Sequence, residues 1–467
     1  MFFRQYDLGC LSLYSYLIGD RRSGRAVVVD PQRDIDAYLA DAAAEGLRIE
    51  RVIETHFHAD FVSGHLEMAD ATGAVISYGP GARADFAIEN LADGQVLSLG
   101  TVALEILHTP GHTPESISIV VRERPDAEPH AVLTGDALFI GDVGRPDLLT
   151  SVGHGADDLA RMLYTSLRDK LLSLPDETLV FPAHGAGSAC GKQLSTAASS
   201  TIGEQRATNY ALADMDVDTF VELITSGQSV APLYFAYAAD ENRRERERFE
   251  TDDPIAPVGL ADAVAERDRG AVLVDTRSGE SFASGHVRGS VNVGLDGRFA
   301  EYAGNVIRAG QRIVLLGSPG RADEARLRLA RIGFDEVVGV VDDIEAALLA
   351  EPSFAESAAR LTAHDVAAWL ADDPGVRVVD VRGPGEVDAT GALPGATLVP
   401  LPTLLDTIEG RSASGVRLDE SAPTIVYCAG GYRSSIAASA MRAHGFTHVA
   451  DLIGGWNAWD LATGRTA

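Results

Sequence analysis

The stretch ArgValIleGluThrHisPheHisAlaAsp at residues 51–60 runs an apolar, strand-like segment directly into two histidines and an aspartate. Three more segments end in the same way, at His112 (after residues 106–111), Asp136 (after 131–135) and His184 (after 179–183). Strand ends present ligands in α/β proteins, so these four segments predict one metal site assembled from distant parts of the chain. Imidazoles and a carboxylate suit borderline divalent ions such as Zn, Fe, Mn or Ni. The sequence therefore predicts a metalloenzyme.

Length and charge narrow the class of protein. The chain has 467 residues, 46% of them hydrophobic, which is enough for two to four domains with proper cores. Its net charge of -29 disfavours nucleic acid and anionic membranes as partners. The three cysteines, Cys10, Cys190 and Cys428, are odd in number and far apart, as is usual in a reducing compartment. No run of about 18 apolar residues occurs and Asp7 interrupts the apolar start, so we expect a cytoplasmic protein without a membrane span.

The first half of the chain reads as one α/β domain, assigned to residues 1–240. Short β-branched runs alternate with helical stretches at 34–45 and 157–172, and a helix is predicted at 61–69. The charged stretch 242–254 is predicted to be a solvated helix end and linker.

The second half contains an internal repeat. With a constant offset of 112 residues, Ile313 falls on Ile425, Arg321 on Arg433 and Phe334 on Phe446. The motif ValAspThrArg at 274–277 likewise has a counterpart, ValAspValArg, at 379–382. We therefore predict two copies of one small α/β domain, at residues 258–350 and 358–467.

The motifs of the first half resemble the metallo-β-lactamase family. They are ThrHisPheHisAlaAsp (55–60), ThrProGlyHisThr (109–113), ThrGlyAspAla (134–137) and ProAlaHisGly (182–185). The resemblance implies an αββα sandwich. Phe61 departs from the family's HxHxDH pattern, in which a histidine at that place serves the second metal.

This departure makes the first domain similar to the persulfide dioxygenase branch of the family. The resemblance implies one Fe(II) per chain, bound by His56, His112 and Asp136, a ligand set that leaves three positions open for a persulfide and O₂. His58, Asp60 and His184 then hydrogen-bond to ligands, water or substrate, or are residual ligands of a second metal.

A glycine-rich loop at residues 144–147 should lie at the mouth of the metal site. Arg145 can donate two hydrogen bonds to a carboxylate of a thiol such as glutathione, which is the role that the resemblance to the persulfide dioxygenase branch implies for this motif. The alternative is a local ion pair between Arg145 and Asp147. Cys190 and Lys192 are predicted to border the cavity, and the alternative for Cys190 is a small buried core residue.

Residues 425–435, IleValTyrCysAlaGlyGlyTyrArgSerSer, form a predicted strand, a tight loop and the first turn of an Ala-rich helix. The loop directs backbone N–H groups and positive charge at Cys428, so we expect a nucleophilic thiol. The residues from about 360 onward resemble rhodanese, the sulfurtransferase family. The resemblance implies that Cys428 carries sulfane sulfur. It also implies that the anionic donor or acceptor of this sulfur is bound by Arg433 and by the loop that contains Gly430, Gly431 and Ser434.

The first copy of the repeat keeps the rhodanese frame but has Leu316 where the second copy has Cys428. Without a thiol it cannot form a persulfide, and we interpret it as an inactive spacer or docking domain. Arg321 retains at most an anion-binding role.

Together these motifs predict a fusion of persulfide dioxygenase and sulfurtransferase in sulfide detoxification. A low-molecular-weight thiol persulfide and O₂ would give sulfite, and sulfur transfer through Cys428 would give thiosulfate. The thiol can be glutathione, coenzyme A, cysteine or another, and a homo-oligomer is expected. The rival interpretations are a thioester hydrolase of the hydroxyacylglutathione type, using a metal-activated hydroxide, and a sulfur carrier or persulfide sensor without activity.

Overall fold

A computed structural model describes residues 1–148, 153, 155–251 and 253–464. The chain divides into two compact units. The first comprises Met1–Gln228 and Phe235–Thr251, and the second comprises Ser229–Tyr234 and Asp252–Ala467. Among the described residues, no helix combines the length and apolar character that a membrane span needs.

The first unit contains two six-stranded sheets. The first sheet has the order β1 (Phe2–Leu8), β2 (Leu13–Asp20), β3 (Arg25–Val29), β4 (Arg48–Ile53), β5 (Val75–Tyr78) and β6 (Glu89–Asn90). The second has the order β12 (Ser200–Thr201), β11 (Leu179–Pro182), β10 (Ala131–Gly135), β9 (Ile117–Arg122), β8 (Ala103–His108) and β7 (Val96–Ser98).

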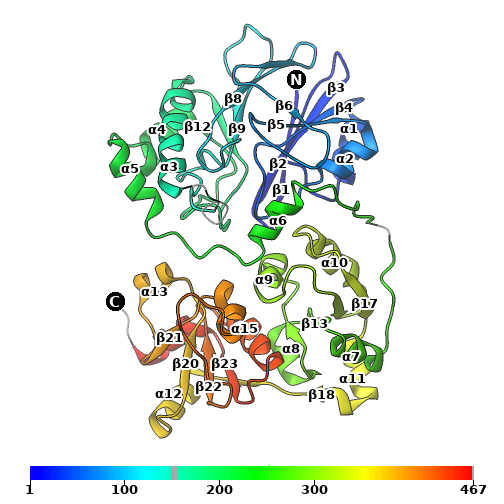
Figure 1. Cartoon of the computed structure of the whole chain (residues 1–467), viewed down its shortest axis with the longest axis vertical. Coiled ribbons are helices and arrows are strands. Elements are labelled where there is room, and N and C mark those ends of the chain that lie inside the picture. Colours follow the sequence, from blue (N-terminus) through cyan, green and yellow to red (C-terminus); the bar gives the residue numbers. More distant parts are fainter. Residues whose placement is uncertain (149–152, 154, 252, 465–467) are drawn as a thin grey trace. The chain divides into compact units, whose positions relative to one another are not determined.

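The two sheets pack face to face and are covered by helices on their outer faces (Figure 1). Side chains of both sheets, such as Val27, Ile53 and Ile119, share one buried core. Helices α1 (Asp36–Ala44) and α2 (His65–Thr72) cover the first sheet, whereas α3 (Ala156–Thr165), α4 (Ile202–Thr208) and α5 (Val217–Thr225) cover the second. The predicted αββα sandwich is confirmed.

The strand directions place the functional residues at one edge. Strands β8 and β10 both run antiparallel to β9, and β11 runs parallel to β10, so their carboxyl ends meet. The helix predicted at 61–69 starts later than expected, at His65, because residues 54–64 form an irregular loop that carries the metal motif. The helix predicted at 157–172 is present, but its second half is a π turn at Ser166–Lys170.

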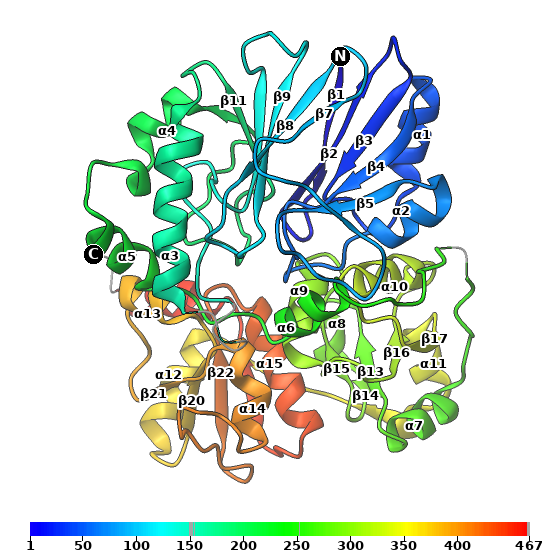
Figure 2. The same cartoon turned by 45° about the horizontal axis from the view of Figure 1, so that its top comes forward.

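Helix α6 (Phe235–Glu241) belongs to the first unit. The second unit contains two sheets of parallel strands, one for each rhodanese-like copy (Figure 2). The first copy has the order β15 (Val291–Asn292), β13 (Val272–Asp275), β16 (Ile313–Leu316) and β17 (Val337–Val341). The second has the order β19 (Ala359–Leu361), β23 (Val449–Leu452), β22 (Thr424–Tyr427), β20 (Arg377–Asp380) and β21 (Ala396–Leu398). A short ladder joins β14 (His286–Val287) to β18 (Ala355–Glu356).

Helices flank both sheets. Those of the first copy are α7 (Leu260–Asp268), α8 (Gly279–Ser284), α9 (Phe299–Val306), α10 (Ala322–Ala330) and α11 (Ile344–Ala350). Those of the second are α12 (Ala363–Asp372), α13 (Pro384–Thr390), α14 (Leu404–Ile408), α15 (Tyr432–Ala443) and α16 (Gly455–Thr463).

The strand register corrects one detail of the repeat. Asp275 pairs with Leu316 in the first copy, and its counterpart Asp380 pairs with Tyr427 in the second. Leu316 therefore corresponds to Tyr427, and Gly317 occupies the place of Cys428. The prediction of Leu316 at this position was wrong by one residue, because the second copy has one residue more between its strand end and Arg433 than the first copy has between Leu316 and Arg321. The first copy still lacks a thiol there.

Candidate metal centre and sulfur-transfer loop

His56, His112 and Asp136 lie together in the first unit, and their ligand atoms are all within 4.8 Å of one another. All three side chains are buried. Nε2 of His112 is 3.4 Å from Oδ2 of Asp136, and Nε2 of His56 is 3.8 Å from the same oxygen. The loops after β4, β8 and β10 thus bring two imidazoles and one carboxylate to a common point.

The far side of each ring is held so that Nε2 faces this point. His56 Nδ1 lies 3.0 Å from Thr55 Oγ1, whose hydroxyl donates to Asp30. His112 Nδ1 donates to the carbonyl of Arg145 at 2.8 Å. Such hydrogen bonds fix the tautomer that leaves the Nε2 lone pair available to a metal. Gly144 is required here because a Cβ at this position would lie 2.0 Å from the carbonyl oxygen of Asp136.

The donor set fits a divalent cation. Nε2 of His56 and both carboxylate oxygens of Asp136 are buried without a hydrogen-bond partner among the described residues. Buried polar atoms are normally satisfied, and a metal ion at this point would satisfy all three. Burial and the neighbouring imidazoles lower the pKa of His56, which keeps it in the neutral, metal-binding form.

A second group, His58, Asp60 and His184, lies beside the first, again with ligand atoms within 4.8 Å. Nε2 of His184 is 3.4 Å from Asp60 and 3.5 Å from Asp136, so the two groups are continuous. Phe61, at the place of the missing histidine, is buried and packs against the ring of His58.

Two buried carboxylates that the sequence reasoning missed hold His58. Its Nε2 is 3.0 Å from Asp30 and 3.5 Å from Glu54. Burial alone would lower the pKa of His58, but these carboxylates and Asp60 raise it to about 9. Asp30 also accepts from the backbone N–H of Thr55 at 2.7 Å. The available signal was the apolar run of β3, which ends at Asp30 in the same way as the four segments that were recognised.

Asn242 is the other residue that the sequence reasoning missed. Its amide donates to the carbonyls of His58 (2.9 Å) and Phe61 (2.7 Å), and its carbonyl accepts from the N–H of Ser63 (2.8 Å). Arg246 forms an ion pair with Glu67 at 2.6 Å, and both side chains are buried. The prediction that 242–254 is solvated was therefore wrong for Asn242 and Arg246, because the first turns of this segment clamp the metal loop.

The residues predicted to bind substrate lie in different surroundings. Arg145 is buried and forms a fork with Asp147, through two hydrogen bonds of 2.7 Å each, so the local ion pair is what the structure contains. Cys190 reaches the metal site, with its sulfur grouped with Asp136 and His184, and burial raises its pKa well above the ordinary value. Lys192 donates instead to the carbonyl of Leu223 on α5 at 2.7 Å.

In the second unit, Cys428 lies at the end of β22 in a loop that closes onto α15. The N–H of Gly431 donates to the sulfur at 3.1 Å, and the hydroxyl of Ser434 lies 3.7 Å from it. Gly431 adopts a left-handed backbone with φ of 96°, which favours glycine. The N–H of Gly431 is thus a backbone donor to the buried thiol, and Gly430 lies in the same loop.

Arg433, which was predicted to bind an anion, is paired with Glu386 on α13. Its two Nη atoms donate to the two carboxylate oxygens at 2.7 and 2.6 Å. Burial raises the pKa of Glu386, but the Arg433 guanidinium outweighs burial and lowers it. An anion that binds Arg433 must therefore compete with this carboxylate. Arg321 in the first copy is exposed and paired with Asp296 and Glu324.

Comparisons with known proteins agree with this architecture. The model of the metallo-β-lactamase superfamily matches residues 8–87 and 77–184, and the model of the rhodanese-like domain matches 260–343 and 362–462. A mitochondrial persulfide dioxygenase ETHE1 of Bos taurus is 32% identical over 235 residues, which cover 50% of this chain and 83% of the relative. A hydroxyacylglutathione hydrolase of Polaromonas sp. is 35% identical over 174 residues, 37% of this chain and 61% of the relative. A crystal structure of a metallo-β-lactamase from Staphylococcus aureus has 32% identity and a TM-score of 0.68, and the match covers 73% of this chain and 98% of that one.

The chain belongs to the metallo-β-lactamase superfamily, whose fold is built to bind metal. Its first half is homologous to the ETHE1 persulfide dioxygenases, and its second half carries two rhodanese-like domains. The predicted fold and family resemblance are both confirmed.

Proposed function

We propose that the chain is a persulfide dioxygenase fused to a sulfurtransferase, and that it converts sulfide-derived persulfides to sulfite and thiosulfate. One observation carries the first activity, namely the grouping of the ligand atoms of His56, His112 and Asp136. Two imidazoles and one carboxylate are the ligand set of non-haem Fe(II) oxygenases, because they leave adjacent positions open. The homology to persulfide dioxygenases supports the same conclusion.

In this proposal His56, His112 and Asp136 hold Fe(II), which when bound supplies the place where persulfide and O₂ react. The overall change is RSSH + O₂ + H₂O giving RSH and sulfurous acid, in which the terminal sulfur loses four electrons and O₂ gains them. The hydroxyl of Thr55, which is itself bonded to Asp30, orients the imidazole of His56, and the carbonyl of Arg145 orients that of His112. The apolar rings of Phe61 and Phe139 exclude water from one side of His58 and His184.

The second activity is assigned to Cys428. Its thiolate attacks the terminal sulfur of a persulfide, the S–S bond breaks, and the departing thiolate takes the persulfide proton. Sulfite then attacks the outer sulfur carried on Cys428, which releases thiosulfate and restores the thiolate. The N–H of Gly431 donates to the Cys428 sulfur and would stabilise its negative charge.

The test is O₂ consumption by anaerobically prepared, Fe(II)-loaded protein given glutathione persulfide, with sulfite and thiosulfate quantified. The proposal predicts uptake of one O₂ for each sulfite formed, counted as free sulfite plus thiosulfate, and it predicts thiosulfate only when Cys428 is present. The rival function, hydrolysis of a glutathione thioester, draws support from the relative in Polaromonas sp. and from the second group of His58, Asp60 and His184. It predicts two metal ions per chain, thioester cleavage and no O₂ uptake, and that result would replace the dioxygenase.

A further inference from the structure

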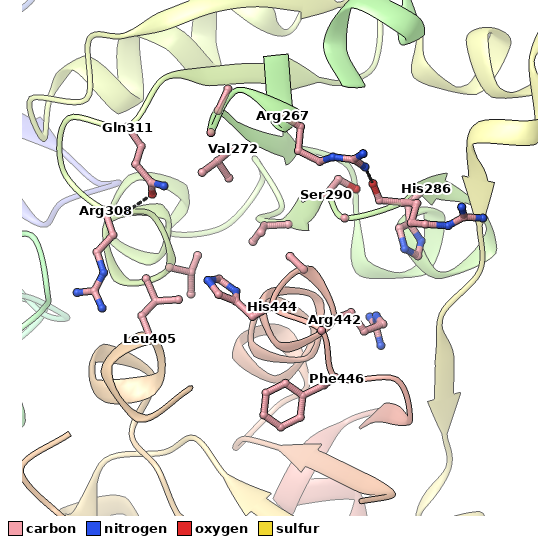
Figure 3. A pocket seen from close by; sticks show the side chains of 18 of the residues that line it. Arg267, Val272, His286, Ser290, Arg308, Gln311, Leu405, Arg442, His444 and Phe446 are labelled. Atoms are coloured by element: carbon pink, nitrogen blue, oxygen red, sulfur yellow. Dashed lines mark hydrogen bonds between the residues drawn. The ribbon is translucent and has the colours of Figure 1, made fainter. Parts of the chain in front are cut away.

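A pocket of about 770 Å³ opens within the second unit, between the two rhodanese-like copies (Figure 3). The first copy contributes residues around β13 and β15, and the second contributes the end of α15 and the turn that follows it. Helix α15 has 12 residues and is therefore about 18 Å long. Because the Cys428 loop precedes its first residue, the pocket lies at the opposite end of the helix from the sulfur-transfer site.

The pocket is basic although the chain as a whole is strongly acidic. Four arginines and two histidines line it, against two glutamates, Glu356 and Glu409. The arginines are Arg267, Arg288, Arg308 and Arg442, and the histidines are His444 and His286. Burial lowers the pKa of His286 to about 4, so its ring is neutral near pH 7 and adds no charge to the pocket. Figure 3 shows Arg442 and His444 on one wall and Arg267 and His286 on the other.

Two of the four arginines are neutralised within the protein. Arg308 is paired with Asp406 at 2.6 Å and Glu409 at 2.5 Å, and Arg267 is paired with Asp268 at 2.8 Å. Arg288 has only a loose contact of 3.7 Å with Glu356, and both of these side chains are exposed. The charge left for a ligand therefore comes from Arg288 and above all from Arg442.

Arg442 is a mostly buried cation without a carboxylate at ion-pair distance among the described residues. Its Nη1 donates to the carbonyl of Val449 at 3.0 Å, but no carboxylate among the described residues lies within 4.0 Å of its guanidinium. Asp451 and Glu356 act on it from a distance, and Asp451 is bound by Arg360 at 3.0 Å. Burial lowers the pKa of Arg442 and outweighs the opposing effect of Asp451 and Glu356, so the charge of Arg442 is only partly compensated. An anion in the pocket would supply the missing partner.

Apolar side chains complete the lining. Val291, Leu405 and Phe446 are buried and border the same space. Organic ligands are typically held in cavities of about 300–1,000 Å³ that combine apolar walls with a few charged groups. This pocket exceeds the size of a bare inorganic oxyanion.

We propose that this pocket binds a small organic anion, in which an oxyanion group (carboxylate, sulfonate or phosphate) pairs with Arg442 and an apolar body contacts Phe446 and Leu405. Arg288 contributes charge at the rim. This site is separate from the metal centre and from Cys428, and so it can bind its ligand while both are intact.

The experiment is titration calorimetry of the full-length protein with naphthalene-2-sulfonate and with phenyl phosphate. The proposal predicts saturable 1:1 binding of at least one probe, weakened tenfold or more by Arg442→Gln. Arg377→Gln serves as the matched control, because Arg377 is an exposed arginine of the same copy that does not line the pocket, and its replacement should leave binding unchanged. The uncharged 2-naphthalenemethanol should bind at least tenfold more weakly than the sulfonate.

Three outcomes would overturn the proposal. They are no saturable binding of either probe to the wild-type protein, equal binding to the Arg442→Gln variant, and loss of binding in Cys428→Ser, which would move the probe to the sulfur-transfer loop. If Arg442→Gln does not fold, Arg288→Gln replaces it, because that side chain is 69% exposed and its loss should weaken binding without disturbing the core.

Discussion

Replacing Asn242 by alanine tests whether the segment after α6 positions the metal loop. The substitution removes three hydrogen bonds and leaves the carbonyls of His58 and Phe61 and the N–H of Ser63 without their partner. A buried polar group left unpaired costs about 1–3 kcal/mol, so three such groups should cost about 3–5 kcal/mol after partial relaxation. Because residues 58–63 form one loop with His56, part of this loss should appear as weaker metal binding, by about 10–100-fold.

The assay is competition for Fe(II) between the protein and a chelator, together with thermal unfolding of the same samples. Asn305→Ala is the matched control. Asn305 is an equally buried asparagine of the second unit that bonds to the N–H of Leu233 and the carbonyl of Glu301. Its loss should lower stability but leave iron affinity unchanged. Sulfur transfer at Cys428 should persist in Asn242→Ala, which shows that the second unit remains folded. Wild-type iron affinity in Asn242→Ala would refute the reasoning.

Three further predictions concern single residues. Cys428→Ser should abolish thiosulfate formation but leave O₂ uptake and sulfite release intact, measured by an oxygen electrode and ion chromatography; loss of O₂ uptake as well would show that the first activity depends on the second. His112→Ala should reduce iron per chain to near zero by elemental analysis while sulfur transfer continues, and full iron occupancy would contradict the ligand assignment. Burial raises the pKa of Glu67, but Arg246 and Arg33 outweigh burial and lower it to about 2. Its ionised form therefore stabilises the fold above about pH 4.5, and this stabilisation is lost as the pH falls toward 2. Glu67→Gln should flatten the dependence of the free energy of unfolding on pH in this range, measured by urea unfolding. An unchanged pH dependence would refute the assignment.

The metal motif and the Cys428 loop could be predicted because their signals are local. Each ligand directly follows an apolar run, and a strand end followed by His or Asp is visible within about six residues of sequence. The same is true of Cys428, since a strand, a glycine-rich turn and a helix start are contiguous. Such patterns indicate candidate site residues without any knowledge of how the strands pair, and the structure groups His56, His112 and Asp136.

The supporting residues could not be predicted in this way, because their partners are distant in the chain. Asn242 lies 179 residues from Ser63, and Arg246 lies 179 residues from Glu67. A run rich in arginine and glutamate also reads as solvated, since such residues are rarely buried unless they are paired, and the pairs are visible only in the folded chain. The predicted start of α2 was wrong for a related reason. Residues 61–64 have helical periodicity, but Asn242 and Arg246 bind their backbone in a loop.

The first rhodanese-like copy, which has no thiol at Gly317, makes structural contacts that its sequence alone does not reveal. The hydroxyl of Tyr432, in the first turn of α15, donates to the carbonyl of Gly294 in that copy at 2.6 Å. One turn further, Ser435 bonds to Asn292, and the hydroxyl of Ser439 accepts from the N–H of the same residue. These contacts hold the helix whose first turn contains Ser434, which lies beside the sulfur of Cys428. The first copy, which has no thiol at Gly317, therefore contributes contacts that hold the helix after the Cys428 loop of the second copy, and the absence of cysteine at Gly317 does not imply an absence of function.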